Sequence, residues 1–296
     1  MHIAVIGSGT ISPDLALPLT QLGGSDVQPR IVNPETFGLC ALAYEELLVD
    51  VGYVDAAQGA AASGADAIFV NSFADYGIEA ARAAVAIPVV GAGEATIAAA
   101  AAGGRRFGIV TVWPKSMAFI YAERLRATEL AARCVGVWHV SPEEELNRLG
   151  EQTGVMQRMA RRDQTVIAQL LRACEQACAA GAEAIALGCT CMAPIGPRLQ
   201  EQFALPVYES SRCGFLATIA AARLAGGGVQ YATPAVVAGS ARARQQIRQL
   251  VDAWLGSASG AQAAGAQGAG EQPLAACQVC ISVADDAADH GNGVTS

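Results

Sequence analysis

The chain has 296 residues, a net charge of −8 and a pI near 4.9, and 52% of its residues are hydrophobic but only 5% aromatic. This length allows one large domain or two lobes with sizeable cores. An acidic chain without a large Lys/Arg cluster is not expected to bind nucleic acid. A membrane protein is not expected either, because no apolar run long enough to span a bilayer is free of both Gly and charge.

The N-terminus begins with an apolar run that leads directly into a glycine-containing loop. We interpret His2–Ile6 as a buried strand and not as a signal peptide, because no basic region precedes it. Together with an odd number of cysteines, nine, this predicts reduced thiols and a cytoplasmic protein. The loop, Gly7-Ser8-Gly9-Thr10, lacks the third glycine of a dinucleotide site, where Ser12 stands, so no nucleotide cofactor is predicted.

Strand patterns and helix patterns then alternate along the chain. Apolar runs with the length of buried strands are His2–Ile6, Val27–Val32, Ala65–Val70, Val85–Val90, Phe107–Val112, Cys134–His139, Ala184–Leu187 and Pro206–Tyr208. Helical patterns cover Asp14–Leu22, Ala41–Ser63, a helix from Ile78, Ala95–Ala102, Pro142–Arg148, Val155–Ala180, Pro194–Phe203 and Arg212–Ala225. Such alternation predicts parallel sheets with crossover helices.

An internal repeat divides this pattern into two halves. Gly181–Met192 reads GAEAIALGCTCM, and Gly64–Ala74 reads GADAIFVNSFA, so that Ser72 aligns with Cys189. A second match follows in step, at the Ile-Pro-Val and Leu-Pro-Val runs around Pro88 and Pro206. We therefore predict an α/β fold of two pseudo-symmetric lobes, each a mostly parallel sheet flanked by helices, with the active site in the cleft between them.

The repeat also suggests domain boundaries. Residues 1–95 plus 206–225 are assigned to the first lobe and residues 96–205 to the second, followed by a linker and C-terminal helix at 226–255. Residues 256–296 are rich in Gly, Ala, Ser and Gln, which predicts a disordered low-complexity tail. The tail contains Cys277-x-x-Cys280, which without a second ligand pair is a weak zinc or redox signal.

Cys189 is the strongest candidate for chemistry. It follows a predicted strand and lies shortly before a helix, where unpaired backbone N–H groups favour a thiolate. A thiolate here can act as a base, a nucleophile or a metal ligand. No metal site is predicted, because Cys189-x-Cys191 lacks a partner pair, and the chain has only three histidines. His139 is the only histidine at a strand end, which also disfavours a Cys-His hydrolase.

Two opposed acid/base groups on either side of one carbon can invert a stereocentre. One group removes the α-proton and the other returns a proton to the opposite face. Such a site requires no cofactor when backbone donors and apolar walls stabilise the enolate.

At these positions the sequence resembles the Asp/Glu/hydantoin racemase superfamily. Leu187-Gly188-Cys189-Thr190 is similar to the LGCT motif around that superfamily's second cysteine, and Met192-Ala193 is closer to the hydantoin/allantoin racemase branch. Ser72-Phe73-Ala74-Asp75-Tyr76-Gly77 resembles that branch's first cysteine motif, with serine replacing cysteine. Residues 88–95 and 107–111 also resemble the branch, and the similarity spans roughly residues 1–225.

The resemblance implies a two-lobe fold and a cofactor-independent racemase or isomerase. It implies that the substrate is a small molecule, namely an amino acid, a hydantoin, or a related carboxylate or ureide, and that the protein is a homo-oligomer. It assigns Cys189 and Ser72 as the catalytic pair. The predicted substrate contacts are Asn71, Thr190, Asp75, Thr10, Gly188 and Thr111.

Serine at position 72 leaves three hypotheses open, because an unactivated hydroxyl is a far weaker acid/base than a thiol. In the first, the protein is a racemase in which Ser72 relays protons through Asp75 or water. In the second, only Cys189 performs chemistry on one face, as in decarboxylation or cis-trans isomerisation. In the third, the cleft binds a small acid or ureide without catalysis. Asp75 also fits a loop-capping role, and Glu209, at the end of the last strand, fits either the cleft lining or an exposed loop.

Overall fold

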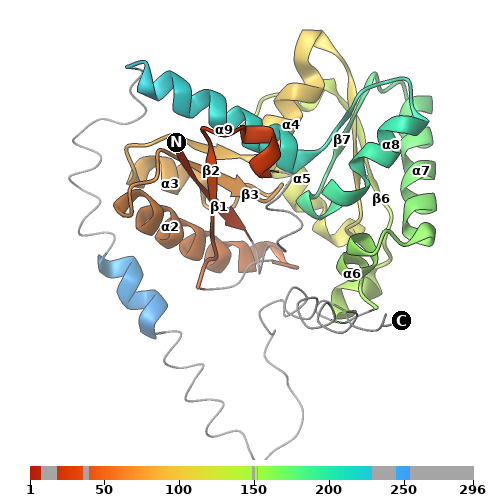
Figure 1. Ribbon diagram of the computed structural model, residues 1–296. Coiled ribbons are helices and arrows are strands. Elements are labelled where there is room, and N and C mark those ends of the chain that lie inside the picture. Colours follow the sequence, from red (N-terminus) through yellow and green to blue (C-terminus); the bar gives the residue numbers. More distant parts are fainter. Residues whose placement is uncertain (8–18, 36–39, 149–150, 152, 229–244, 254–296) are drawn as a thin grey trace, which may run out of the picture.

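The computed structural model describes residues 1–7, 19–35, 40–148, 151, 153–228 and 245–253. Two four-stranded sheets lie side by side in this part of the chain, each flanked by helices (Figure 1). All strand pairs within both sheets are parallel. The predicted fold of two α/β lobes is therefore confirmed.

The two sheets have the same strand order. The first, β2-β1-β3-β4, contains β1 (His2–Gly7), β2 (Gln28–Val32), β3 (Ala67–Asn71) and β4 (Val89–Gly91). The second, β6-β5-β7-β8, contains β5 (Phe107–Thr111), β6 (Cys134–His139), β7 (Ala184–Leu187) and β8 (Val207–Tyr208). Each strand of the second sheet thus repeats the place of a strand in the first, and β3 corresponds to β7. This agrees with the sequence repeat that aligns Ser72 with Cys189.

The first sheet is apolar on both faces, as expected for parallel strands covered by helices on each side. Alternate residues of a strand point to opposite faces. Ala4 and Ile6 therefore join the larger core beneath α2 (Glu46–Ala62), whereas Ile3 and Val5 join a smaller core with Phe215 of α9 (Ser210–Gly226). Since both faces are buried, the strand reads as a continuous apolar run and not as an alternating one.

The helices largely follow the predicted pattern. Those of the first lobe and the lobe junction are α2, α3 (Ile78–Ala84), α4 (Ala92–Ala101) and α9 (Ser210–Gly226). Those of the second lobe are α5 (Ala118–Ala127), α6 (Val155–Ala160), α7 (Gln164–Ala179) and α8 (Gly196–Gln202). Short 3-10 helices are η1 (Ala43–Glu45), η2 (Ala102–Gly104), η3 (Lys115–Met117), η4 (Ala131–Arg133), η5 (Glu143–Arg148) and η6 (Thr190–Ile195). Residues 19–23 are also helical.

The predicted and observed helices differ at two places. The single helix expected at 155–180 is broken into α6 and α7, because Arg162 adopts a φ of 56° and Asp163 begins a new helix. The Asp163 carboxylate accepts the N–H groups of Thr165 and Val166, at 2.9 and 3.1 Å. Helix α5 was not predicted, although a crossover between β5 and β6 requires an element at this place.

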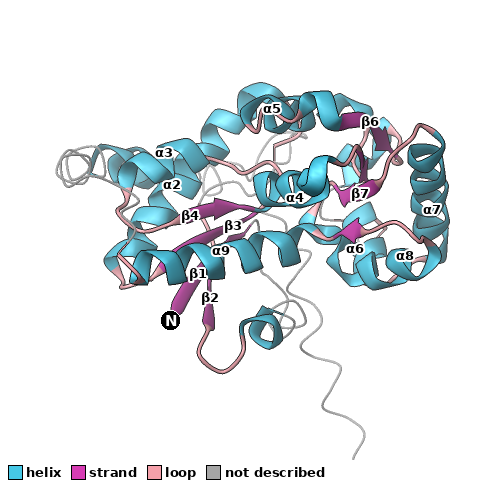
Figure 2. Cartoon of the chain, turned by 90° about the horizontal axis from the view of Figure 1, so that it is seen from above, coloured by secondary structure: helices cyan, strands magenta, loops and turns pink. Residues whose placement is uncertain are grey.

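The segment 206–225, assigned as a whole to the first lobe, is divided between the two sheets. Strand β8 pairs with β7 in the second sheet, whereas α9 packs on β3 and β4 of the first. Helix α4 lies between the two sheets, in contact with both α9 and β7 (Figure 2). The chain therefore crosses back to the first lobe immediately after β8, which places the start of α9 at the junction.

Part of the predicted C-terminal helix is present and contacts the first lobe. Residues 245–253 are helical, and Val251 is fully buried. Arg248 forms ion pairs with Glu35 and Asp55, at 2.7 and 3.0 Å. The tail at 256–296 lies outside the described residues, as do Cys277 and Cys280. In the described part, no helix has the length and apolar character needed to cross a membrane.

Candidate active site

The candidate site lies where the two middle strands, β3 and β7, end at the junction of the lobes. Open parallel sheets bind ligands at the carboxyl ends of their strands. The hydroxyl of Thr190 donates a hydrogen bond to the main-chain carbonyl of Asn71 across the junction, at 3.3 Å. The rings of Phe73 and Tyr121 also meet there, with centroids 5.5 Å apart. These contacts bring the loops that carry Ser72 and Cys189 together, as the repeat predicts.

Cys189 is nine-tenths buried, and its sulfur accepts a main-chain hydrogen bond. It begins η6 and accepts the main-chain N–H of Cys191 at 3.2 Å. The Cys191 and Trp113 side chains also favour the ionised form of this sulfur. Burial alone raises the pKa of a thiol, but here these donors outweigh it and lower the pKa of Cys189 below its ordinary value. The site therefore favours a thiolate.

A directed chain of hydrogen bonds fixes the peptide that precedes Cys189. The Tyr121 hydroxyl donates to the carbonyl of Gly188 at 3.0 Å, so it accepts the Thr111 hydroxyl at 2.5 Å. Thr111 in turn accepts the main-chain N–H of Trp113 at 3.2 Å. A Cβ at Gly188 would lie 2.9 Å from the Tyr121 ring, so only glycine fits this position without displacement. Thr111, predicted as a substrate contact, is fully buried, and its hydroxyl contacts that of Tyr121.

Ser72 lies opposite, at the end of β3. Its half-buried hydroxyl accepts the N–H of Ala74 at 3.3 Å, which is a local turn contact. The preceding residue, Asn71, accepts the hydroxyl of Ser211 on its side-chain oxygen Oδ1, at 3.0 Å. This bond fixes the Asn71 amide and directs its oxygen toward α9.

The Asp75 carboxylate does not contact the Ser72 hydroxyl in the described structure. It is buried and accepts the N–H groups of Gly93 and Glu94, at 2.7 and 2.8 Å, at the start of α4. Arg124 of α5 lies 3.7 Å away. A Cβ at Gly91 or Gly93 would lie within 3.0 Å of this carboxylate, so the glycines make room for it. Asp75 thus joins the lobes and caps α4, which is the structural role weighed against a proton relay.

The remaining predicted residues are placed as follows. Thr10 lies outside the described residues. Glu209 is the N-cap of α9, where it accepts the N–H groups of Ser211 and Arg212, so it is not an exposed loop acid. His139 is half-buried, with Nδ1 3.1 Å from the Trp113 carbonyl, and burial lowers its pKa. In the described part of the chain, no three His, Cys, Asp or Glu side chains are grouped so as to hold a metal ion.

The family model described as Asp/Glu/Hydantoin racemase matches residues 18–218, more than half of the chain. The protein belongs to this family. The match covers both lobes and includes Ser72 and Cys189, and it confirms the family that the sequence motifs indicated. The helix at 245–253 lies beyond the matched region.

Individual relatives and folds are consistent with this family. A hydantoin racemase from Pseudomonas sp. (strain NS671) is 26% identical over 222 residues, covering 69% of this chain and 81% of that protein. The allantoin racemase from Klebsiella pneumoniae has a TM-score of 0.66 at 20% identity, over 80% of this chain and 93% of the other. Arylmalonate decarboxylase has a TM-score of 0.52 at 22% identity, over 80% and 97%. At identities of 20% and 22%, these two solved structures show that this chain shares their fold, and no more than that.

Two residues of the site were not identified from the sequence. Trp113 lies two residues after the end of β5, so its position near a strand end was the available signal. Tyr121 belongs to α5, and only the crossover between β5 and β6 pointed to a helix there. Both depend on the packing of the second lobe, which brings Trp113 to Cys189 and Tyr121 to Gly188.

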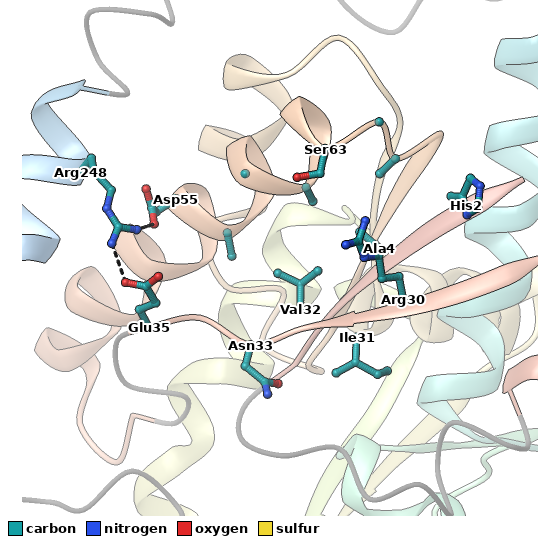
Figure 3. A pocket seen from close by; sticks show the side chains of 15 residues that line it. His2, Ala4, Arg30, Ile31, Val32, Asn33, Glu35, Asp55, Ser63 and Arg248 are labelled. Carbon is teal, nitrogen blue, oxygen red and sulfur yellow. Dashed lines mark hydrogen bonds and ion pairs between the residues drawn. The ribbon is translucent and has the colours of Figure 1, made fainter.

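A cavity of about 400 Å³ lies elsewhere, between α2 and the strands β1 and β2. Figure 3 shows Arg248 reaching from the C-terminal helix toward Asp55 and Glu35 at one end, while Arg30 lies over the strands. The described residues that line this cavity include none of the predicted site residues. The cavity is therefore separate from the chemistry at the junction of the lobes.

Proposed function

We propose that this protein is a cofactor-independent racemase that acts at the acidic α-carbon of an amino acid or of a hydantoin or ureide derivative. The observation that carries the proposal is the environment of Cys189, a buried sulfur that accepts the main-chain N–H of Cys191 and whose pKa is lowered, in a member of a racemase family. The names of the relatives, hydantoin racemase and allantoin racemase, support a small ureide-type substrate.

In this mechanism the Cys189 thiolate removes the α-proton from one face of the substrate and becomes a thiol. The electron pair of the C–H bond moves onto the neighbouring carbonyl as an enolate, which backbone and side-chain N–H groups stabilise. The amide nitrogen of Asn71 is proposed as one such donor, supported by the bond from Ser211 that engages the amide oxygen. A proton then returns from the Ser72 side to the opposite face, which inverts the stereocentre.

A second candidate, chemistry on one face alone, is favoured by the surroundings of Ser72. A serine requires a neighbouring base to transfer protons efficiently. The Asp75 carboxylate is occupied by Gly93, Glu94 and Arg124 instead. In a decarboxylation, the electrons of the broken C–C bond remain on the α-carbon, CO₂ leaves, and the Cys189 thiol protonates the carbanion. Arylmalonate decarboxylase shares the fold, although this likeness alone assigns no activity.

Hydrogen exchange in D₂O separates the two candidates. Each enantiomer of selected amino acids and hydantoins, and of allantoin, is incubated with the protein, and α-deuterium is followed by NMR, with malonates tested for CO₂ release. Exchange from both enantiomers supports racemisation. Exchange from only one, or decarboxylation, contradicts it and supports the one-face candidate. The absence of exchange and turnover on every compound would contradict both and leave a binding role.

Two variants sharpen the result. Cys189→Ala is expected to lower the rate by roughly 10²-fold or more, since this is the usual contribution of a general acid/base. Cys178→Ala, on the remote helix α7, is the matched control and should leave the rate unchanged. Ser72→Cys should accelerate exchange on the slower face if the hydroxyl limits proton transfer. Retained activity in Cys189→Ala would exclude both enzymatic candidates.

A further inference from the structure

The cavity between α2 and the strands β1 and β2 exists because small side chains face one another across it. On the α2 side, the lining residues include Ala56, Gly59, Ala60 and Ser63. On the strand side, Ala4 and Val32 share the face that is turned toward α2. A Cβ added to Gly59 would meet no other atom within 4 Å, so this part of the helix borders open space. The result is a cavity of about 400 Å³.

Arg30 reaches this cavity without a protein partner. It lies on the same face of β2 as Val32, since alternate residues of a strand point the same way, and it is the register partner of Ala4 (Figure 3). Among the residues that the structure describes, the Arg30 guanidinium forms no hydrogen bond or ion pair, and neither do the side chains of His2 and Ser63. All three can donate hydrogen bonds. The cavity therefore presents free donors and a free positive charge.

The acidic residues at the other end of the cavity are already paired. Arg248 binds Glu35 and Asp55, at 2.7 and 3.0 Å, so that these two carboxylates do not compensate Arg30 (Figure 3). Arg248 belongs to the helix at 245–253, which lies beyond the residues that the family model matches. This end of the cavity is thus built with a segment outside the matched region.

We propose that this cavity is a binding site for a small organic monocarboxylate, distinct from the site at the junction of the lobes. The Arg30 guanidinium can hold a carboxylate through two parallel hydrogen bonds. The apolar part of the ligand then lies against Val32, Ala56 and Ala60. A few polar groups on a largely apolar wall, in a volume of this size, are typical of small-molecule sites.

The charges around the cavity favour one negative charge on the ligand over two. Arg30 is the only arginine or lysine without an ion-pair partner among the described residues of the lining. Ser63 is the C-cap of α2, and the carbonyl end of a helix carries a partial negative charge that opposes further anions. A doubly charged phosphate is therefore expected to bind less well than a carboxylate with an apolar chain.

Isothermal titration calorimetry of the full chain with hexanoate tests the proposal. Hexylammonium reverses the charge of this probe, and inorganic phosphate keeps negative charge without the apolar chain. Arg30→Gln removes the charge at an exposed position, and Gly59→Leu fills the cavity with a better helix former. Arg172→Gln on α7 and Gly226→Leu at the end of α9 are the matched controls, since a Cβ on Gly226 also meets no atom within 4 Å.

Hexanoate should bind the parent protein, and hexylammonium and phosphate should bind at least about tenfold more weakly. Arg30→Gln should weaken hexanoate binding by about tenfold or more, the usual effect of losing a hydrogen bond to a charged group. Gly59→Leu should abolish binding in the cavity, and the two controls should leave it unchanged. Circular dichroism verifies folding, and Arg30→Gln decides the question if Gly59→Leu does not fold.

The absence of hexanoate binding to the parent protein would overturn the proposal. So would binding that Arg30→Gln retains in full, or binding of phosphate or hexylammonium as tight as that of hexanoate. Arg248→Ala should weaken hexanoate binding severalfold, because Glu35 and Asp55 are then unpaired near the anion. Since none of these measurements requires turnover, their outcome is independent of the racemase proposal.

Discussion

The hydroxyl of Thr190 and the main-chain carbonyl of Asn71 form a hydrogen bond 3.3 Å long between the two halves of the molecule. Thr190 follows Cys189, and Asn71 precedes Ser72, so this bond joins the neighbours of the two aligned residues. The Thr190 hydroxyl, predicted as a donor to substrate oxygen, donates in this structure to the opposite lobe. The two loops that the sequence repeat aligns are thus in direct contact at the site.

Trp113 should control the acidity of Cys189 together with Cys191. In Trp113→Phe the ring volume is largely kept while the indole N–H, the only side-chain donor of tryptophan, is lost. The pKa of Cys189 should therefore rise, and the midpoint of its alkylation by iodoacetamide should move to higher pH. Trp138→Phe, on β6, provides a comparison in the same lobe, and an equal shift in both variants would contradict a specific bond from Trp113.

Asp75 should make stability depend on pH. Burial, reinforced by Glu94 and opposed by Arg124, raises the pKa of Asp75 from 3.8 to about 7. Between about pH 4 and pH 7 the folded protein therefore keeps a proton that the unfolded chain has lost. The free energy of unfolding should fall as pH rises through this window, by up to about 1.4 kcal/mol per pH unit.

Asp75→Asn is expected to flatten this dependence, which urea denaturation at a series of pH values would measure. The control is Asp163→Asn, another helix-capping aspartate, whose pKa is lowered by hydrogen bonds from Arg158 and from the start of α7. Asp163 contributes stability above its ordinary pKa that is lost as pH falls through the lowered value, so its replacement should affect only the acid end. An unchanged slope in Asp75→Asn would contradict the burial argument.

Tyr121 should stabilise the peptide before Cys189. Tyr121→Phe leaves the Gly188 carbonyl without the tyrosine donor and the Thr111 hydroxyl without its acceptor in a buried place. We expect a loss of about 1–3 kcal/mol in the free energy of unfolding, the usual cost of unsatisfied buried groups, and a lower kcat/KM. Tyr208→Phe, which removes only a half-buried bond from Arg105, should cost less in denaturant titrations. Equal losses would argue against the proposed chain of bonds.

Arg248 should anchor the C-terminal helix to the first lobe. It pairs with Glu35, Asp55 and Asp252 on a partly exposed surface. Arg248→Ala should therefore lower overall stability by less than about 1 kcal/mol, but it should increase hydrogen exchange at residues 245–253. Activity should be unchanged because the candidate site is elsewhere. Arg223→Ala, which breaks a surface pair with Asp26, should leave exchange in that helix unaltered.

The sequence alone predicted the architecture well because its signals are local or periodic. Apolar runs of strand length, the helical spacing between them and the Gly-Ala-acid-Ala-Ile repeat are all contained in short stretches of chain. They placed Cys189 and Ser72 at equivalent strand ends, and the motif around Cys189 indicated the family that the comparison with known proteins confirmed.

Only the tertiary structure decided which side chains meet. Asp75 is three residues from Ser72 in sequence, yet its carboxylate bonds to Gly93 and Glu94, since a left-handed turn with a φ of 53° directs it to α4. Trp113 is far from Cys189 in sequence but contacts it because β5 and β7 are neighbours in one sheet. The pKa of a buried group depends on such long-range partners. Residue type and spacing thus identified the thiol, and packing determined its burial and the groups that surround it.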